Sequence, residues 1–420
     1  MTSTIAEQRN VLQEQANELV EFQIGILDSL AQGENPREVA KLSRQFLTKV
    51  YGNGNDFAPP SGADLGISVN KVCNLRCAHC YYANTHIPDN TEEGALETNR
   101  WRDITAQAID LGMKHISIIG KEPLLSPDKT RAILETIDEK RKQGFEVRQE
   151  MITNGTLIDR NIGWLRQHQD FYFFSISFDG YREDHDKVRG EGAYRKSLEG
   201  LKIAKDAGIK NLTAIFTAMP HNVGSLERMV EDLANAGLDY LSVGYCFPTA
   251  HNEQGLTAGA DLFKRTIDIA PTLHPNLEVS LNILGDEHPQ IISELYKEGF
   301  FSLDKLGATE DLAPSLIIPL SQRTSTTPRA LVNCTTLPTV FYGGFRIDYD
   351  GTAIDFCADL RTQEKRGFGN VNDSTIEELY KKSKAIWPEY TERYYERLSK
   401  ALKGEEVGAV QNWYGVSVVK

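Results

Sequence analysis

Short apolar runs alternate with longer amphipathic stretches through the middle of this chain. Apolar residues at helical spacing predict helices near 97–112, 127–143, 157–168, 193–207 and 223–236. The apolar runs around them predict buried strands at 65–70, 115–120, 146–153, 171–178, 211–218 and 239–245. Because right-handed helical crossovers join parallel strands, this alternation predicts an α/β fold with a partial (β/α)6 barrel.

The regions before and after this alternation have different patterns. Residues 1–62 predict a helical segment that ends in a linker rich in Gly, Asn and Pro. A helix start within it is Asn35-Pro36-Arg37-Glu38, where the Asn can cap the helix and the Pro suits its first turn. The barrel itself is expected at 63–250, and residues 251–330 form a connecting region that is hard to interpret.

The last part of the chain, 331–420, predicts a small α+β extension. Asp350-Gly351 lies between two strand-like runs and predicts the turn of a β-hairpin. Two amphipathic patterns, near 373–386 and 389–403, predict two further helices. The chain is therefore expected to have a helical N-terminal segment, a central barrel and a smaller C-terminal unit.

Composition and charge argue against several classes of protein. Of the 420 residues, 40% are hydrophobic and 25% are charged, which is typical of a globular protein. No apolar run reaches the roughly 18–20 residues that cross a bilayer, and the N-terminus lacks the basic and apolar parts of a secretory signal. The net charge of −13, without a block of Lys and Arg, argues against a nucleic-acid partner. We therefore expect a cytoplasmic protein with no membrane or nucleic-acid partner.

Three of the six cysteines lie close together, as Cys73, Cys77 and Cys80. In a chain with so few cysteines, this clustering indicates metal or redox chemistry instead of disulfides. The C-x3-C-x2-C spacing lets one short loop bind three corners of a [4Fe–4S] cluster and leaves the fourth iron open to another ligand. Structural zinc is the alternative, but it needs a fourth ligand, and His79 lies between two of the cysteines. The residues favour an iron–sulfur cluster and leave zinc open.

Polar and Gly-rich segments mark the ends of the other predicted strands, as the cysteine loop marks the end of the first. In parallel barrels the carboxyl ends of the strands gather on one rim, where ligands bind. The segments at this rim are Gly120-Lys121-Glu122-Pro123, Thr153-Asn154-Gly155-Thr156, Ser175-Ile176-Ser177-Phe178-Asp179-Gly180 and Cys246.

Residues 63–246 resemble the radical S-adenosylmethionine (SAM) superfamily, and more narrowly its branch of peptide maturases with SPASM-type C-terminal extensions. The GGEP motif of that family is similar to Gly120-Lys121-Glu122-Pro123, with Lys121 in place of a glycine. The resemblance implies that this turn contacts the amino group of SAM, largely through main-chain carbonyls, and that Tyr81 packs near the adenine. It implies further contacts with the ribose and carboxylate from Asn154, Ser177, Asp179 and Arg189.

Two of these contacts have simpler alternatives: Asp179-Gly180 could be a plain turn, and Arg189 could be a surface charge. The resemblance also implies the cofactors, a [4Fe–4S] cluster and SAM. In the family, one electron from the cluster cleaves a C–S bond of SAM and releases a 5′-deoxyadenosyl radical, which abstracts hydrogen from the substrate.

The implied substrate is a ribosomally synthesised precursor peptide. The implied outcomes are excision or rearrangement, as in splicease-type enzymes, epimerisation, or crosslinking. A radical SAM enzyme that acts on a small metabolite is one alternative. A zinc-stabilised α/β binding protein without catalysis is the other.

The C-terminal extension has few cysteines for the auxiliary clusters of SPASM enzymes. Cys334 and Cys357 are the two in this region, and two ligands cannot by themselves hold a four-iron cube. The extension is therefore expected to be a shortened SPASM-like unit in which both cysteines are simply buried. The alternative is an auxiliary cluster completed by ligands other than cysteine. Without an auxiliary cluster there is no obvious electron acceptor, which favours redox-neutral outcomes over oxidative crosslinking.

Cys246 lies just beyond the sixth predicted strand, on the rim where the substrate is expected. A thiol there could donate a hydrogen atom to a substrate radical, as in peptide epimerases of the superfamily. Alternatively, it could simply pack in the core, as buried cysteines usually do.

Two partner proteins follow from the same resemblance. The first 60 residues lack the strands of the leader-recognition domain that many such maturases carry, which implies a separate small recognition protein. The cluster also needs a reductant, such as flavodoxin or ferredoxin.

Overall fold

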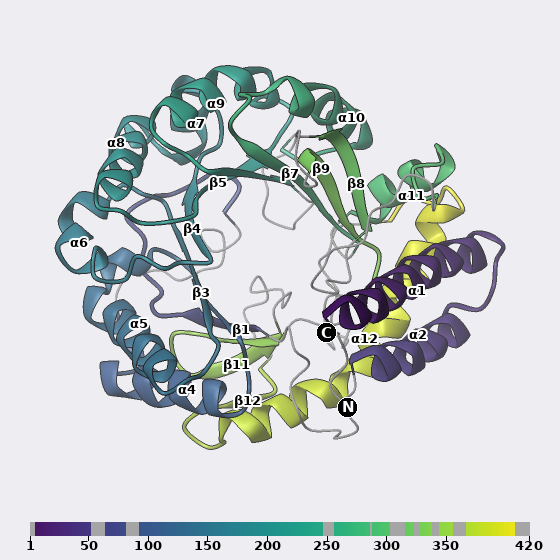
Figure 1. Cartoon of the computed structure of the whole chain (residues 1–420), viewed down its shortest axis with the longest axis horizontal. Coiled ribbons are helices and arrows are strands. Elements are labelled where there is room, and N and C mark those ends of the chain that lie inside the picture. Colours follow the sequence, from purple (N-terminus) through teal and green to yellow (C-terminus); the bar gives the residue numbers. More distant parts are fainter. Residues whose placement is uncertain are drawn as a thin grey trace, which may run out of the picture.

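The computed structural model shows a ring of helices around an inner sheet, with the strands facing the centre of the ring (Figure 1). The residues that the structure describes are 5–51, 64–80, 92–246, 256–285, 288–302, 316–322, 328–337, 344–355 and 367–407. Among them, no helix is long and apolar enough to cross a membrane.

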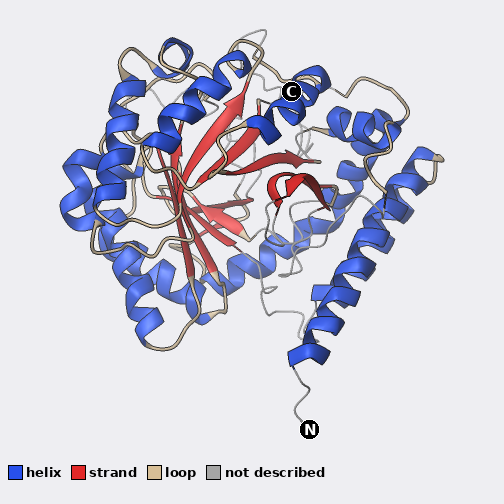
Figure 2. Ribbon diagram, turned by 45° about the horizontal axis from the view of Figure 1, so that its top comes forward, coloured by secondary structure: helices blue, strands red, loops and turns tan. Residues whose placement is uncertain are grey.

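The twelve described strands belong to one sheet, in the order β12-β11-β10-β1-β2-β3-β4-β5-β6-β7-β9-β8 (Figures 1 and 2). Each neighbouring pair from β10 through to β9 is parallel, and β11, β12 and β8 are antiparallel additions at the two ends. The sheet is not closed. The strands are β1 (Asp64–Ser68), β2 (His115–Ile119), β3 (Arg148–Thr153), β4 (Phe173–Ser177), β5 (Leu212–Ala218), β6 (Tyr240–Tyr245), β7 (Glu278–Leu284), β8 (Leu316–Gln322), β9 (Pro328–Thr335), β10 (Phe345–Ile347), β11 (Thr352–Asp355) and β12 (Gly369–Asn370).

The six predicted strands and the helices that connect them are confirmed, with ends that shift by a few residues. The hairpin at Asp350-Gly351 is confirmed too, because β10 and β11 pair antiparallel around it. The helices are α1 (Ile5–Ala31), α2 (Pro36–Tyr51), α4 (Thr98–Asp110), η1 (Pro123–Leu125), α5 (Pro127–Lys142), α6 (Ile158–Leu165), α7 (Glu183–Arg189), α8 (Ala193–Asp206), η2 (Val223–Ser225), α9 (Leu226–Asn235), α10 (Ala260–Ile269), η3 (Ala270–Thr272), α11 (Pro289–Lys297) and α12 (Ile376–Leu402).

The parallel part of the sheet is longer than the six strands that the sequence predicted. Strand β7 adds to β6, β9 adds to β7, and β10 returns from the C-terminal region to pair with β1. Strands from the proposed connecting region and extension therefore share the barrel sheet. The domain boundaries at 62, 250 and 330 remain a prediction.

The two helices predicted near 373–386 and 389–403 are wrong as separate elements, because α12 runs continuously and contains Pro388. A proline inside a helix lacks one hydrogen bond and clashes with the preceding turn. Packing compensates: the helix buries Tyr380, Tyr394 and Leu398 in the core, and it lies against α1, α2 and α11. A capping box at Thr375 stabilises its start.

The two faces of the sheet differ in polarity, as the alternation of side chains along a strand allows. The outer face packs against the helices and is apolar, with core residues such as Leu65, Ile67, Ile116, Ile118, Phe174, Ile176, Ala214, Phe216, Val243 and Leu281. The inner face carries many polar side chains, among them Ser117, Glu150, Ser175, Thr213, Ser242, Ser280, Asn282 and Asn333. The apolar core thus lies between sheet and helices, and the centre of the barrel is polar.

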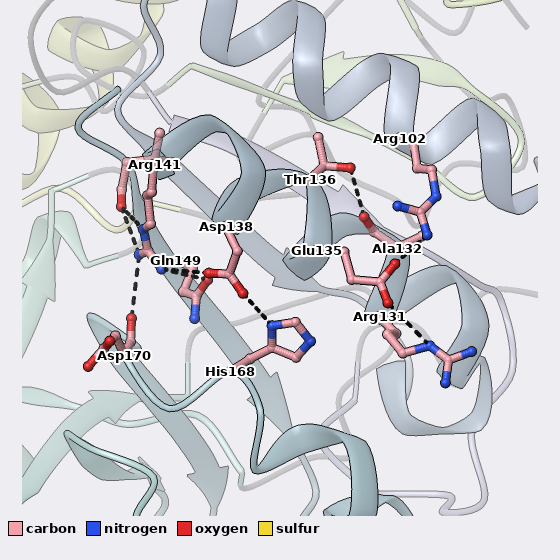
Figure 3. Close-up of polar contacts among 11 residues, drawn as sticks. Arg102, Arg131, Ala132, Glu135, Thr136, Asp138, Arg141, Gln149, His168 and Asp170 are labelled. Carbon is pink, nitrogen blue, oxygen red and sulfur yellow. Dashed lines mark hydrogen bonds and ion pairs between the residues drawn. The ribbon is translucent and has the colours of Figure 1, made fainter. Parts of the chain in front are cut away.

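Polar contacts fix α5 to its neighbours at the amino end of β3 (Figure 3). His168 Nδ1 lies 2.6 Å from Asp138 Oδ2, and Arg141 donates to the Gln149 side chain at 3.1 Å. Arg102 of α4 pairs with Glu135. Such partly exposed pairs contribute about 0–1 kcal/mol each. They stabilise the end of the barrel opposite the cysteine loop.

Candidate functional site

The three motif cysteines lie on the loop that follows β1, at the carboxyl end of the parallel strands. These cysteines form no disulfide with another described residue, and their side chains are partly exposed. They are also near one another, because the charge of Cys80 affects the pKa of both Cys73 and Cys77. Main-chain groups shape the loop: the Leu75 N–H lies 3.4 Å from Cys73 Sγ, and the Cys80 N–H donates to the Cys77 carbonyl.

These thiols fit the ligand set of an iron–sulfur cluster. Among the described residues, no three His, Cys, Asp or Glu side chains converge as ligands of a single metal ion do. The ligands of a cube need not converge in that way, because each cysteine binds a different iron. Two cations lie beside the cysteines. The pKa of Lys121 is affected by the charges of all three cysteines, and Arg189 Nη1 lies 4.0 Å from Cys77 Sγ. These cations would offset the negative charge of thiolate ligands.

Burial raises the pKa of Cys73, and it raises the pKa of Cys77 to about 12 although Arg189 acts against the shift. Without a metal, the thiols of Cys73 and Cys77 are therefore protonated at neutral pH. A metal that binds them displaces those protons, since the thiolate is the ligand.

Glu122 is fully buried, and its carboxylate joins the ends of β2 and β3. One oxygen accepts from the Leu124 N–H at 3.0 Å and from the Thr153 hydroxyl at 2.7 Å, while the other accepts from the Asn154 N–H at 2.8 Å. The Asn70 side chain donates to the Glu122 carbonyl at 2.9 Å. Burial raises the pKa of Glu122, and these donors oppose the shift. The side chain thus fixes the shape of the rim between two strands.

The other residues of this turn have distinct environments. Gly120 has a φ of 114°, and a Cβ added there would lie 3.0 Å from the Cβ of Ser68. A residue with a side chain is therefore strained at this position. Pro123 is buried and begins η1, whereas Lys121 is partly exposed beside the cysteines, where burial lowers its pKa. The Lys in place of a family Gly thus brings a positive charge to the cysteine loop.

Asn154 connects the end of β3 to the cysteine loop. Its Nδ2 donates to Asn74 Oδ1 at 2.9 Å and lies 4.0 Å from Cys73 Sγ. Its Oδ1 accepts from the Thr156 N–H at 2.9 Å and hydroxyl at 2.6 Å, and Asn74 Nδ2 donates to the same hydroxyl oxygen at 2.9 Å. The structure therefore brings Asn154 next to the predicted cluster, as the rim argument requires.

Asp179 and Arg189 form a buried ion pair beside the second cysteine. Arg189 Nε donates to Asp179 Oδ2 at 2.5 Å, and the Thr217 N–H donates to Asp179 Oδ1 at 3.0 Å. Burial alone would raise the pKa of Asp179, but Arg189 and nearby histidines lower it to about 2. Arg189 is therefore not a surface charge, and the Asp179 side chain does more than form a turn. Ser177 is buried at the end of β4, on the sheet face opposite the outer core.

Two histidines around this pair were not predicted as site residues. His79 Nε2 lies 3.5 Å from Asp179 Oδ2, and the Asp179 N–H donates to His185 Nδ1 at 3.1 Å. Burial lowers the pKa of His79, and it lowers the pKa of His185 to about 4. The sequence drew attention to His79 only as a doubtful zinc ligand. Nothing local in the sequence indicated a role for His185, because it comes close to Asp179 only when α7 folds back on the end of β4.

Cys246 follows β6 directly and is buried. It packs with Val188, Met219 and Leu256 in a small apolar cluster, against which Ala78 of the cysteine loop also packs. The structure therefore brings Cys246 to the cysteine loop, as strand counting predicted, within an apolar environment. Its chemical role remains a prediction.

The remaining cysteines and one predicted adenine contact can be placed only in part. Cys334 is fully buried in β9, between Ile283 of β7 and Leu316 of β8, and burial raises its pKa. It packs as a small apolar residue. Cys357 and Tyr81 lie outside the described residues.

Polar side chains form a ladder across β6, β7 and β9 on the inner face of the barrel. Asn282 Nδ2 donates to Ser242 Oγ at 3.0 Å, and Asn333 Nδ2 donates to Asn282 Oδ1 at 3.0 Å. The Asn333 Oδ1 atom is buried and accepts no hydrogen bond within the described part of the chain. An amide oxygen of this kind can accept from a ligand N–H. No local pattern in the sequence indicates this ladder, because Ser242, Asn282 and Asn333 come together only through the pairing of β6, β7 and β9.

Comparisons with known proteins agree with this site. Residues 67–233 match the model of the radical SAM superfamily. Fe-coproporphyrin III synthase from Methanosarcina barkeri is 32% identical over 144 residues, 34% of this chain and 34% of that protein. The subtilosin biosynthesis protein AlbA from Bacillus subtilis is 24% identical over 241 residues, 56% of this chain and 51% of AlbA. The matches thus span between a third and about half of these relatives.

The fold is similar to that of SuiB from Streptococcus suis. The SuiB structure with bound S-adenosylmethionine has a TM-score of 0.55 at 15% identity, and covers 82% of this chain and 71% of SuiB. The SuiB structure with its precursor peptide SuiA also has a TM-score of 0.55, at 16% identity, with 83% and 70% covered. The likeness to SuiB concerns the fold alone. The family match and the three cysteines beyond β1 show that residues 67–233 of this chain are a radical SAM domain, of the family that uses a [4Fe–4S] cluster and S-adenosylmethionine.

Proposed function

We propose that this chain is a radical SAM enzyme that modifies a ribosomally synthesised precursor peptide. Cys73, Cys77 and Cys80 would hold the cluster, which with SAM supplies a 5′-deoxyadenosyl radical able to abstract hydrogen. The Glu122 carboxylate keeps the rim turns in place, and Asp179 orients Arg189 toward Cys77. We assign the SAM contacts to the rim residues predicted above, namely Tyr81, Gly120, Lys121, Glu122, Pro123, Asn154, Ser177, Asp179 and Arg189.

The choice of a peptide as substrate rests on the length of the match to AlbA. The AlbA match covers 241 residues, which is longer than the 67–233 domain, whereas the Fe-coproporphyrin III synthase match covers 144 residues. Similarity that extends beyond the domain favours a shared substrate class. AlbA is described by its bacteriocin biosynthesis, and SuiB has been solved with a precursor peptide. The half-exposed polar ladder of Ser242, Asn282 and Asn333 also suits a peptide, since amides and hydroxyls pair with main-chain groups.

Two finer assignments belong to the same proposal. With Cys334 buried in the sheet, a redox-neutral outcome such as excision, rearrangement or epimerisation is favoured over oxidative crosslinking. A separate small protein would present the leader of the peptide to the barrel. The small-metabolite alternative has its support in the higher identity to Fe-coproporphyrin III synthase.

Anaerobic reconstitution tests the proposal in two steps. The wild-type protein should bind about four irons per chain, and dithionite with SAM should give 5′-deoxyadenosine and methionine. A variant with Cys73, Cys77 and Cys80 all changed to Ala should bind almost no iron and give neither product. Incubation with precursor peptides encoded beside the gene should then give a mass change that depends on SAM. Iron retained by the triple variant, or S-adenosylhomocysteine as the product, would contradict the reaction. Modification of a small metabolite with no peptide product would contradict the substrate class.

A further inference from the structure

A surface pocket of about 520 Å³ lies between the cysteine loop and helices α6 and α8. The loop contributes Asn74, and the turn after β3 contributes Gly155 and Thr156. The first turn of α6 and the first two turns of α8 supply its charged side chains. The pocket therefore lies beside the predicted cluster. Helices α6 and α8, which contribute to its lining, belong to the outer ring (Figure 1).

Three cations of this pocket are exposed: Arg160 of α6, and Arg195 and Lys196 of α8. None of them forms an ion pair within the described part of the chain. Two carboxylates, Asp159 and Glu199, share the lining, so three positive and two negative charges leave a formal charge of +1. The whole chain carries −13. This surface is thus locally basic on an acidic protein.

Hydrogen bonds connect the pocket wall to the first cysteine. Asn74 and Thr156 line the pocket and bond to each other at 2.9 Å. Asn154 bonds to both, and its Nδ2 lies 4.0 Å from Cys73 Sγ. One side chain therefore separates the surface pocket from a ligand of the predicted cluster.

An apolar residue completes the lining. Leu125 of η1 is 37% exposed, which is unusual for a large hydrophobic side chain in this structure. Protein interfaces commonly have an apolar centre with a polar rim. Opposite charges on two partners steer them together and fix their orientation.

We propose that this surface, formed by Asn74, Leu125, Arg160, Arg195 and Lys196, docks an acidic protein that carries single electrons. The inference rests on the proposed function, because only reduction of the cluster calls for such a carrier. The reduced carrier loses one electron and the cluster gains it, so the carrier is oxidised by one electron and the cluster is reduced by one electron. The carrier's negative surface pairs with the three cations, and the electron enters on the Cys73 side through Asn154.

Charge reversal tests the docking surface, with a bacterial flavodoxin of net negative charge as the probe. The variant Arg160→Glu, Arg195→Glu, Lys196→Glu, reconstituted with iron and sulfide, is compared with wild type in two measurements. The first is the binding of oxidised flavodoxin, followed by flavin fluorescence. The second is the rate at which the reduced flavodoxin is oxidised by the enzyme. In the variant, the affinity for flavodoxin and the rate of flavodoxin oxidation should each fall about tenfold or more. The association of the two proteins should also depend less on salt concentration.

A matched control removes the effect of net charge. The variant Lys41→Glu, Arg265→Glu, Lys400→Glu changes the same number of exposed cations, on α2, α10 and α12. It should weaken flavodoxin binding by less than about threefold, because charges more than a Debye length from the interface are largely screened. Dithionite needs no docking, so cluster reduction by dithionite should be the same in both variants.

Equal losses in the two triple variants, or no loss in the pocket variant, would overturn the docking surface. If the pocket variant does not fold, Arg195→Gln with Lys196→Gln replaces it, with an expected weakening of about threefold and with unchanged binding as the contrary result. Wild-type enzyme that fails to cleave SAM with dithionite would refute the proposed reaction. The comparison of flavodoxin binding would still decide the docking surface.

Discussion

Replacing Glu122 by Gln tests whether the carboxylate builds the rim. Its two oxygens accept from three donors: the N–H groups of Leu124 and Asn154, and the hydroxyl of Thr153. That hydroxyl itself accepts from the Gly155 N–H at 3.1 Å, so its proton is directed to Glu122. The carboxylate is thus surrounded by donors. In a Gln side chain one of the two acceptors becomes an NH2 group, which then faces another donor.

The size of the effect follows from these contacts. In the better of the two amide orientations, the Gln oxygen accepts hydrogen bonds from the Leu124 N–H and the Thr153 hydroxyl. The Gln NH2 group then faces the Asn154 N–H, which loses its acceptor. Each buried donor left without an acceptor costs about 1–3 kcal/mol. Loss of the buried charge works in the opposite direction, since burial raises the pKa of Glu122. We expect the opening free energy of this turn to fall by about 2–4 kcal/mol, with Asn154 as its weakest point.

Hydrogen exchange measures this local opening directly. A loss of about 2–4 kcal/mol speeds exchange of the Asn154 amide roughly 30- to 1,000-fold, at 1.36 kcal/mol per factor of ten. The melting temperature of the whole chain should fall by only about 2–4 °C, because a chain of this size has a large unfolding entropy. Glu139→Gln, at an exposed position of α5, is the matched control and should change neither the exchange rate of the Asn154 amide nor the melting temperature. Unchanged exchange at Asn154 in Glu122→Gln would show that the carboxylate does not hold the turn.

Three further changes test other parts of the structure. Cys246→Ala should leave iron content and substrate-free SAM cleavage unchanged while peptide product falls, because the thiol packs beside the cysteine loop without belonging to the predicted ligands; loss of iron, assayed by absorbance, would contradict this. Asn333→Leu removes the buried amide oxygen of the inner ladder and should raise the KM for peptide about tenfold with SAM cleavage intact, and an unchanged KM would remove the ladder from the peptide site. Pro388→Ala should stabilise the continuous helix α12 by about 1–3 kcal/mol, measured by thermal unfolding, and a lower melting temperature would show that the proline is needed there.

The fold could be predicted where local pattern and topology agree. Each of the six predicted strands is a short apolar run, and each connecting helix has the spacing that buries one face against the sheet. Strand β7 was missed for a physical reason. Its sequence EVSLNIL alternates between a core-facing and a lumen-facing residue, and it lacks a block of aromatic residues like the one at 171–174 that leads into β4. Strand β10 is short, and nothing local indicates that it returns to pair with β1.

For the candidate site, the sequence predicted which residues lie near one another but not the directions of their side chains. Parallel topology puts the carboxyl ends of all strands on one rim, and this rule alone placed Asn154, Asp179 and Cys246 near the cysteine loop. It could not say where their side chains point. The turn that contains Glu122 was expected to contact SAM largely through main-chain carbonyls, and the rule does not show that its side-chain oxygens accept from the protein's own donors. The direction of a side chain depends on partners distant in sequence.

Arg189 is another side chain whose position depends on partners distant in sequence. A guanidinium as buried as this one is stable only with a partner, and Asp179 supplies it at 2.5 Å. That pairing occupies Nε and leaves Nη1 toward Cys77, at 4.0 Å from its sulfur. Asp179 is itself held by the main chain of β5, through Thr217. The position of one charge beside the predicted cluster therefore depends on two strands and a short helix, so it can be set only when the whole rim has folded.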